Sequence, residues 1–144
     1  SFIQSLVDNL SVSYALQPAR ITITIDADEV LFPIDISIPL GLILNELCTN
    51  TMKYAFLDNS FGHINISLKH QNPDSVSVQV TDDGIGIPET FDIENAPSLG
   101  LQLVQLLSEQ ISAKLTIQRN NPTSFTLIVP LIEQPKELPQ IPVD

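Results

Sequence analysis

Three polar residues of different chemistry, Glu46, Asn50 and Lys53, are spaced four and three positions apart. On an α-helix this spacing places their side chains on one face. A carboxylate, an amide and an ammonium group on one face could hold a hydrated metal ion and a phosphate together. Mg²⁺ prefers oxygen ligands such as the Asn50 amide, and Lys meets phosphate as a point charge. The alternative is an ordinary solvated helix face.

A second candidate segment is 80–88 (VTDDGIGIP), where a predicted strand runs into a loop. Gly84 and Gly86 permit tight turning and close approach of the backbone to a ligand. Asp82, at the end of the strand, presents a carboxylate that can accept a hydrogen bond from an exocyclic amine, a contact that distinguishes adenine from guanine. The same residues could instead form a simple turn.

A third candidate is Ser98-Leu99-Gly100-Leu101, at the start of a Leu-rich predicted helix. Ser98 suits an N-cap, and the unpaired N–H groups of a helix N-terminus attract anions. The alternative is an ordinary cap followed by core residues. The chain has only 5 glycines, and three of them lie in the second and third segments. This concentration indicates that the backbone requires glycine there.

Hydrophobic periodicity predicts the elements that position these residues. Helical spacing predicts helices at 2–14, from 38 or 39 to 56, and at 98–111. Alternation of polar and apolar residues predicts strands at 21–26, 29–32, 64–69, 76–81, 115–118 and 125–129. The mixed order favours an α+β fold, a two-layer sandwich with helices on one face of a mixed, largely antiparallel sheet.

The composition excludes several classes of protein. Six Lys and Arg against 17 Asp and Glu give a net charge of -11 over 144 residues, which argues against a nucleic-acid binder because clustered cations carry that affinity. The hydrophobic fraction of 43% can build the core of one domain. The single cysteine, Cys48, cannot form an intrachain disulfide and is expected to be a small buried apolar residue. No apolar run approaches the ~18 residues of a membrane span.

In this order and spacing, the three segments together resemble the nucleotide-binding motifs of sensor histidine kinases. Segment 45–56 (NELCTNTMKYAF) resembles the N-box, Asp82-x-Gly84-x-Gly86 resembles the G1 box, and segment 98–104 (SLGLQLV) resembles the G2 box. The resemblance covers roughly residues 1–131. It is to the catalytic ATP-binding domain of two-component kinases, in the subfamily with an Asn-Glu-Leu-x-Thr-Asn N-box. These domains belong to the GHKL ATPase superfamily, whose Bergerat fold is a helix layer on a mixed sheet.

The resemblance implies a role for each matching residue, with Mg²⁺ and ATP as ligands. Asn50 would coordinate Mg²⁺, Lys53 would contact phosphate, and Asp82 would bind the adenine amine. Glu46 would be the catalytic residue, orienting the acceptor or its proton. Residues 87–97 would form a lid over ATP. The other residues expected to contact ATP are Tyr54, Gly84, Gly86, Ile87, Leu99, Gly100, Leu101 and Thr123.

The chain departs from the family pattern at two places. Ser112-Ala113 stands where glycines are usual, and Pro122-Thr123 stands where Gly-Thr is usual. Pro122 has no N–H and a fixed φ, which affects how Thr123 can reach phosphate. These departures motivate a rival interpretation, a non-catalytic nucleotide-binding or interaction module. Glu46 motivates another, a GHKL serine/threonine kinase or ATP hydrolase, because other GHKL ATPases use Glu at this position to activate water.

The expected organisation has three parts: the end of a helical connection at 1–14, the ATP-binding domain at 15–131, and a Pro-rich tail at 132–144. Because the chain begins with Ser rather than Met, we expect it to be a piece of a longer protein. His63 and His70 bracket a predicted strand and are expected to be surface residues.

The expected partners follow from the resemblance. The phosphoacceptor histidine would lie in a dimerisation segment of the parent chain, and a response regulator would act downstream. We expect the isolated domain to be a monomer, the parent to be a homodimer, this fragment to contact neither membrane nor nucleic acid, and the location to be cytoplasmic.

Overall fold

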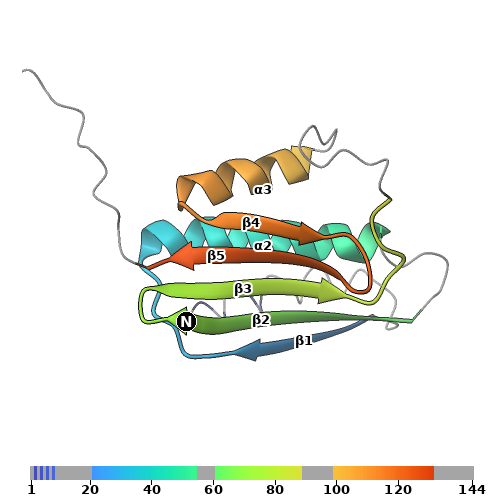
Figure 1. Ribbon diagram of the computed structural model, residues 1–144, viewed down its shortest axis with the longest axis horizontal. Coiled ribbons are helices and arrows are strands. Elements are labelled where there is room, and N and C mark those ends of the chain that lie inside the picture. The colour runs from blue at the N-terminus through green and yellow to red at the C-terminus, as the bar shows by residue number, and fades with distance from the viewer. Residues whose placement is uncertain are drawn as a thin grey trace, which may run out of the picture.

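The computed structural model describes residues 2, 4, 6 and 8, which are helical, and the ranges 21–54, 61–88 and 99–131. The elements in these ranges are shown in Figure 1. In chain order they are β1 (Ile21–Ala27), α2 (Ile34–Tyr54), β2 (Gly62–Asn72), β3 (Ser75–Asp82), α3 (Leu99–Gln110), β4 (Lys114–Gln118) and β5 (Thr123–Pro130).

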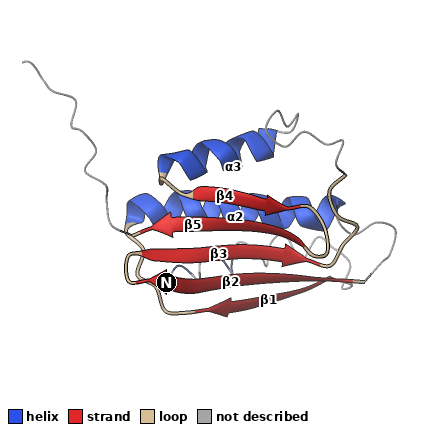
Figure 2. Ribbon diagram, viewed as in Figure 1, coloured by secondary structure: helices blue, strands red, loops and turns tan. Residues whose placement is uncertain are grey.

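The five strands form one sheet in the order β1-β2-β3-β5-β4. β1 and β2 are parallel, because α2 carries the chain across between them, and the other neighbouring pairs are antiparallel. In Figure 2, α2 passes behind the sheet and α3 lies beside it. The predicted α+β fold with a mixed, largely antiparallel sheet is therefore confirmed. No helix in the described ranges has both the length and the apolar character of a membrane span.

The core lies between α2 and the inward face of the sheet. Alternate residues of β2 and β3 are buried, while their neighbours face away from the helices. α2 contributes Leu40, Leu44 and Leu47, each at most 1% exposed, and burying such a side chain stabilises the fold by about 1.5–3 kcal/mol. Leu6 joins the same core, and the ring of Phe2 stands edge-on to that of Phe32 with centroids 5.1 Å apart.

Two predictions about the segment before the core helix were wrong. Residues 28–33 form no strand, and α2 begins at Ile34 rather than at 38 or 39, so that Pro39 lies inside the helix. The N–H groups of Ile36 and Ser37 both donate to the carbonyl of Pro33, which starts the helix. Pro39 removes one intrahelical bond, to the carbonyl of Asp35, and Asp35 is exposed, where water can replace that bond.

The end of α3 accounts for one departure from the family sequence. Ser112 has a positive φ of 57°, its N–H donates to the carbonyl of Glu109, and the N–H of Ala113 donates to the carbonyl of Ser108. This pair of bonds is a Schellman motif, in which the residue with positive φ is usually glycine. A serine makes the same turn but carries a steric cost from its Cβ.

Ser112→Gly is therefore expected to stabilise the protein by about 1 kcal/mol, which raises the unfolding midpoint by a few degrees. Thermal unfolding followed by circular dichroism measures the change. Ser112→Ala keeps the Cβ and should leave the midpoint near that of the wild type. If both variants shift the midpoint equally, the strain at this position is not the cause.

Candidate functional site

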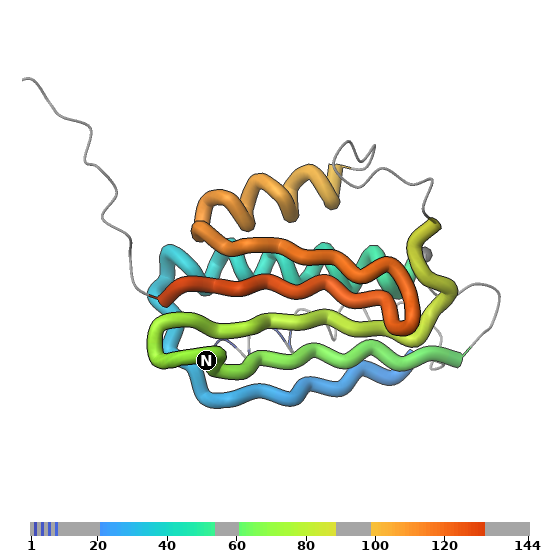
Figure 3. Tube along the Cα trace, in the orientation of Figure 1, coloured from blue at the N-terminus to red at the C-terminus, as the bar shows by residue number. Residues whose placement is uncertain are grey.

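The segments predicted to do chemistry meet at one end of the molecule. The C-terminal end of α2, the C-terminal end of β3, the first turn of α3 and the β4–β5 turn all lie at the same end in Figure 1, and the trace in Figure 3 shows the loop after β3 passing the β4–β5 turn. Helix and strand directions explain this, because α2 and β3 run toward that end while α3 and β5 start from it. The described parts of the three motifs thus converge, although they are far apart in the sequence.

The end of α2 lies close to the start of α3. A Cβ built on Gly100 would lie 2.6 Å from Glu46 Oε2 and 3.6 Å from Asn50 Nδ2. The Glu46 carboxylate therefore occupies space that any other residue at 100 would fill, and the Asn50 amide lies beside it. This places an acidic group and an amide beside the backbone of a helix start.

The remaining predicted residues of these two helices lie around this junction. Lys53 is exposed in the last turn of α2, Leu99 is 79% exposed, and Leu101 is half-buried. Tyr54 ends α2, and its side chain lies outside the described residues. Ser98, Ala55, Phe56 and residues 89–97 of the expected lid also lie outside them.

Asp82 is a buried carboxylate at the end of β3. It is 3% exposed, and its Oδ1 accepts a hydrogen bond of 2.9 Å from the N–H of Gly84. Burial raises the pKa of Asp82 above its ordinary value, against the opposing effect of the Gly84 N–H. The neighbouring Asp83 is exposed, and its Oδ1 accepts from the N–H of His63 at 2.8 Å. Of these two carboxylates, only Asp82 has little access to water and is suited to a single specific partner.

The glycine loop (residues 84–88) is held against the β4–β5 turn. Gly86 has a φ of +85°, and a Cβ there would lie 3.1 Å from the carbonyl oxygen of Arg119. That carbonyl accepts a hydrogen bond of 2.8 Å from the N–H of Ile87. Ile87 itself is partly buried against the core, whereas Ile85 is 65% exposed. Glycine at 86 is thus required both by the backbone angle and by the close approach of the turn.

Thr123 is paired with Asp82 across the β3–β5 ladder and is also buried. Its Oγ1 donates to the carbonyl of Arg119 at 2.9 Å. The preceding Asn121–Pro122 peptide bond is cis, and Asn121 has a φ of 57°. The Thr123 hydroxyl is therefore engaged within the β4–β5 turn, and a contact with phosphate stays a prediction.

Two histidines and the cysteine lie as predicted. His63 and His70 are exposed, and their Nε2 atoms meet Thr24 Oγ1 at 2.9 Å and the Glu29 carbonyl at 3.3 Å. Cys48 is fully buried, and burial raises the pKa of its thiol to about 12, which makes it an apolar core residue.

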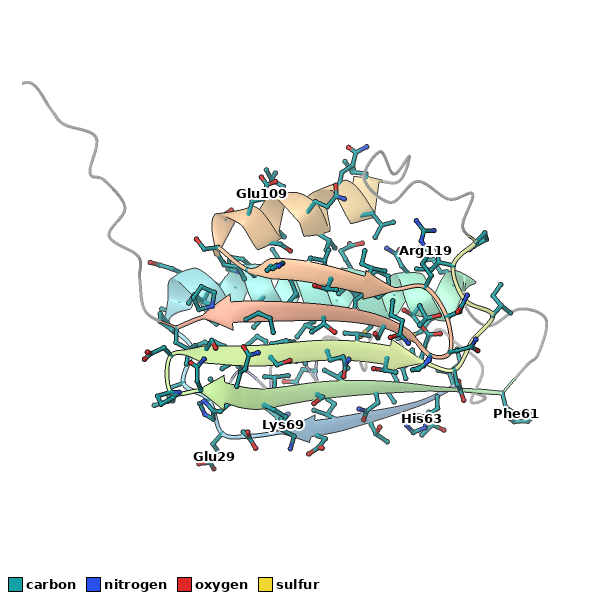
Figure 4. All side chains as sticks on the ribbon, in the orientation of Figure 1. Glu29, Phe61, His63, Lys69, Glu109 and Arg119 are labelled. Carbon is teal, nitrogen blue, oxygen red and sulfur yellow. The ribbon has the colours of Figure 1, made fainter. Side chains whose placement is uncertain are left out.

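Arg119 is a residue of this region that the sequence did not indicate. Its Nη1 donates to the carbonyl of Pro88 at 2.6 Å, and Figure 4 shows it at the end of the sheet where the glycine loop lies. The sequence carried a weak signal, a single cation just before the Asn-Asn-Pro turn. It could not show which loop the turn contacts.

The mixed five-stranded sheet with helices α2 and α3 has the fold of histidine kinase ATPase domains of the GHKL superfamily. Over residues 35–133 the chain matches the family described as "Histidine kinase-, DNA gyrase B-, and HSP90-like ATPase". The chain belongs to this family, and the family and fold predicted from the three motifs are confirmed.

The similar proteins include several histidine kinases. The chain is 31% identical over 115 residues to blue-light-activated histidine kinase 2 of Erythrobacter litoralis, covering 79% of this chain and 33% of that protein. It is 31% identical over 96 residues to the sensor histidine kinase PdtaS of Mycobacterium tuberculosis, covering 64% of this chain and 19% of that protein. The chain thus spans about a third or less of the length of these relatives.

Solved structures of histidine kinases share the fold of this chain. The histidine kinase domain of a blue-light activated histidine kinase from Erythrobacter litoralis superposes with a TM-score of 0.80 at 27% identity, covering 90% of this chain and 59% of that one. The mycobacterial sensor histidine kinase MprB superposes with a TM-score of 0.71 at 19% identity, covering 89% of this chain and 93% of that one, and shares the fold.

Proposed function

We propose that this domain binds ATP with Mg²⁺ and transfers the γ-phosphoryl group to a histidine on a dimerisation segment of the parent chain. The observation that carries the proposal is the junction of Glu46 and Asn50 with Gly100, at the same end of the fold as the buried Asp82. The similarity to sensor histidine kinases supports it. The proposed pathway is two-component signalling, with a response regulator receiving the phosphoryl group afterwards.

The protein groups divide the work of binding. Asp82 accepts a hydrogen bond from the exocyclic amine of adenine, and the glycine loop passes close to the base and sugar. The backbone near Gly100, with Leu99 and Leu101, faces the phosphates through the N–H groups of the helix start. Lys53 adds a cation from the end of α2.

Asn50 and Glu46 fit a Mg²⁺ ion shared with the phosphates. Both carry oxygen atoms, the ligands that Mg²⁺ prefers, and both side chains lie close to Gly100 at the start of α3. In the described part of the chain, no three His, Cys, Asp or Glu residues gather into a metal site. Phosphate oxygens and water molecules would complete the coordination of the ion. We assign the ion to Asn50, where its charge would neutralise the phosphate oxygens.

Glu46 is the proposed catalytic residue. In the transfer, a nitrogen of the acceptor imidazole forms a bond to the γ-phosphorus while the bond to the β–γ bridging oxygen breaks and ADP leaves. The Glu46 carboxylate accepts the proton that the imidazole loses. Positioning of the two reactants supplies most of the rate enhancement, because phosphoryl transfer needs little covalent chemistry from the protein.

The same carboxylate favours a second candidate function. If Glu46 accepts its proton from water or from a Ser or Thr hydroxyl, the domain is an ATP hydrolase or a serine/threonine kinase of the same superfamily. Turnover of ATP by the isolated domain that Glu46→Ala abolishes would favour this candidate. Acid-labile phosphohistidine, formed when a histidine-bearing dimerisation segment is joined to the N-terminus, would favour the histidine kinase. Bound ATP without either product would favour a non-catalytic module.

We expect ATP binding to depend steeply on Mg²⁺. The sequence has no Lys or Arg between Lys69 and Lys114, although Asp82, the glycine loop and Gly100 all lie in this stretch. A tetra-anion bound there meets few side-chain cations, so we expect the affinity to fall by about tenfold or more when Mg²⁺ is removed. Titration calorimetry with ATP, in Mg²⁺ or in excess chelator, measures this. Equal affinity in both buffers would contradict the assignment of Asn50, and no binding at millimolar ATP would contradict the function.

The remaining proposals concern the parent protein. We propose that it is a homodimer in the cytoplasm, that the isolated domain is a monomer, and that residues 1–14 connect to the dimerisation segment. Light scattering of the isolated domain, and of a form extended by the dimerisation segment, would separate the two oligomeric states.

A further inference from the structure

Arg119 contacts the glycine loop at two consecutive residues. Its carbonyl oxygen accepts a hydrogen bond of 2.8 Å from the N–H of Ile87. Its Nη1 donates a hydrogen bond of 2.6 Å to the carbonyl of Pro88. The backbone and the side chain of one residue therefore hold two neighbouring peptide groups of the loop. A guanidinium that donates to a carbonyl makes a charge-assisted bond, which is shorter and stronger than a neutral one.

The same residue is also connected to the beginning of the loop. The Arg119 carbonyl accepts a hydrogen bond of 2.9 Å from the Thr123 hydroxyl, and Thr123 pairs with Asp82 across the β3–β5 ladder. At Asp82 the loop starts, with the N–H of Gly84 bound to the carboxylate. Arg119 thus links the far end of the loop, at Pro88, to the strand position beside the carboxylate at its near end.

The glycine loop and the β4–β5 turn pack closely enough to fix how the loop lies against the turn. A Cβ on Gly86 would lie 3.1 Å from the Arg119 carbonyl oxygen and 3.1 Å from Asn120 Cβ. The loop therefore fits against the β4–β5 turn only with glycine at 86. The guanidinium bond adds a directional constraint at Pro88, an exposed residue where hydrophobic packing contributes little.

We propose that Arg119 is a positioning residue of the nucleotide site, which fixes the distance between Asp82 and the far end of the glycine loop. The inference rests on the proposed function, in which Asp82 binds adenine and the loop passes the nucleotide. Arg119 acts through the loop and has no assigned contact with ATP. Without its side chain, the loop still forms but samples positions that do not enclose the base.

The test compares nucleotide release with stability. The rate of dissociation of a fluorescent methylanthraniloyl-ATP is measured by stopped flow for the wild type, Arg119→Ala and Arg119→Lys, and the unfolding midpoint is measured without nucleotide. We expect about tenfold faster release from Arg119→Ala, corresponding to the loss of one charge-assisted bond, with a midpoint close to that of the wild type. Arg119→Lys keeps one donor for Pro88 and should restore part of the slow release.

Lys114→Ala is the matched control, because it removes an exposed cation from the opposite end of β4. It should release nucleotide at the wild-type rate. If the wild type binds no nucleotide, the proposed function fails. If the wild type binds and Arg119→Ala releases nucleotide at the same rate, the inference about Arg119 alone fails. Arg119→Ala could also release nucleotide faster with a lower unfolding midpoint, while Arg119→Lys restores neither. That result would make the role of Arg119 purely structural and would overturn the inference.

Discussion

Asp82→Asn is expected to weaken ATP binding by about 10- to 100-fold without loss of the fold. The substitution keeps the shape of a side chain that is 3% exposed, but it replaces an acceptor with an amide. If the amide oxygen keeps the bond to Gly84, its NH₂ group faces the adenine amine, so two donors meet. Losing a hydrogen bond to a charged group costs about 1.5–3 kcal/mol, which corresponds to this range of affinity.

The same substitution should make the protein more stable at neutral pH. Burial raises the pKa of Asp82 above its ordinary value of 3.8, so the folded state binds the proton more tightly than the unfolded state does. The stability that this group contributes is present below pH 3.8 and is lost as the pH rises through the folded-state pKa. Asn carries no such cost. Thermal unfolding of both proteins should show a gap in favour of Asp82→Asn at pH 7 that closes in acid.

The control is the neighbouring carboxylate. Asp83→Asn removes a charge one residue away, from an exposed side chain that contacts the N–H of His63. Calorimetry should give this variant an affinity for ATP within about twofold of the wild type, since exposed charges are screened. Equal losses in the two variants would mean that charge near the site matters, rather than a specific contact with adenine.

Gly100→Ala should lower the rate of phosphoryl transfer by about 100-fold or more. The new Cβ would lie 2.6 Å from Glu46 Oε2, a separation that side chains do not tolerate. Because the carboxylate is the far end of a flexible side chain, it moves away rather than unfolding the helix. Displacing a catalytic group by about 1 Å can cost a factor of 10². Incorporation of ³²P into a histidine-bearing form of the protein measures the rate.

A glycine in α2 provides the control. Among the described residues, a Cβ on Gly41 would meet the ring of Phe2 alone, at an ordinary 3.8 Å, so Gly41→Ala should keep full activity and stabilise the helix by about 0.5–1 kcal/mol. Combining Gly100→Ala with Glu46→Gln separates the causes. If displacement of Glu46 explains the loss, Glu46→Gln costs little more in the Gly100→Ala background than alone. Independent, additive losses would contradict that explanation.

The sequence predicted the elements with long, regular periodicity. The helix that carries Glu46 and Asn50, the β2–β3 hairpin and the helix opened by Gly100 all appear within a few residues of the expected bounds. The error at 29–32 has a physical cause. Val30 and Phe32 pack against the core from a loop, so their burial imitates the alternation of a strand.

Contacts between segments could not be predicted from the sequence alone. Glu46 and Gly100 are on different helices, and their separation depends on how α3 packs against α2. The role of Arg119 depends on the register of β3 and β5, which brings the β4–β5 turn to the glycine loop. Motif spacing predicted which groups form the site, whereas packing determines which of the described ones lie close together.

The two edge strands of the sheet, β1 and β4, affect whether the domain can self-associate. β1 and β4 each pair on one side only in the described sheet, and an exposed strand edge can pair with another molecule. β4 has only five residues and begins with Lys114, while β1 carries Asp26, whose Oδ1 lies 2.8 Å from Lys69 Nζ. Short length and charge are the features by which native sheets resist edge-to-edge pairing. We therefore expect the domain not to assemble through its strands at the concentrations that calorimetry requires.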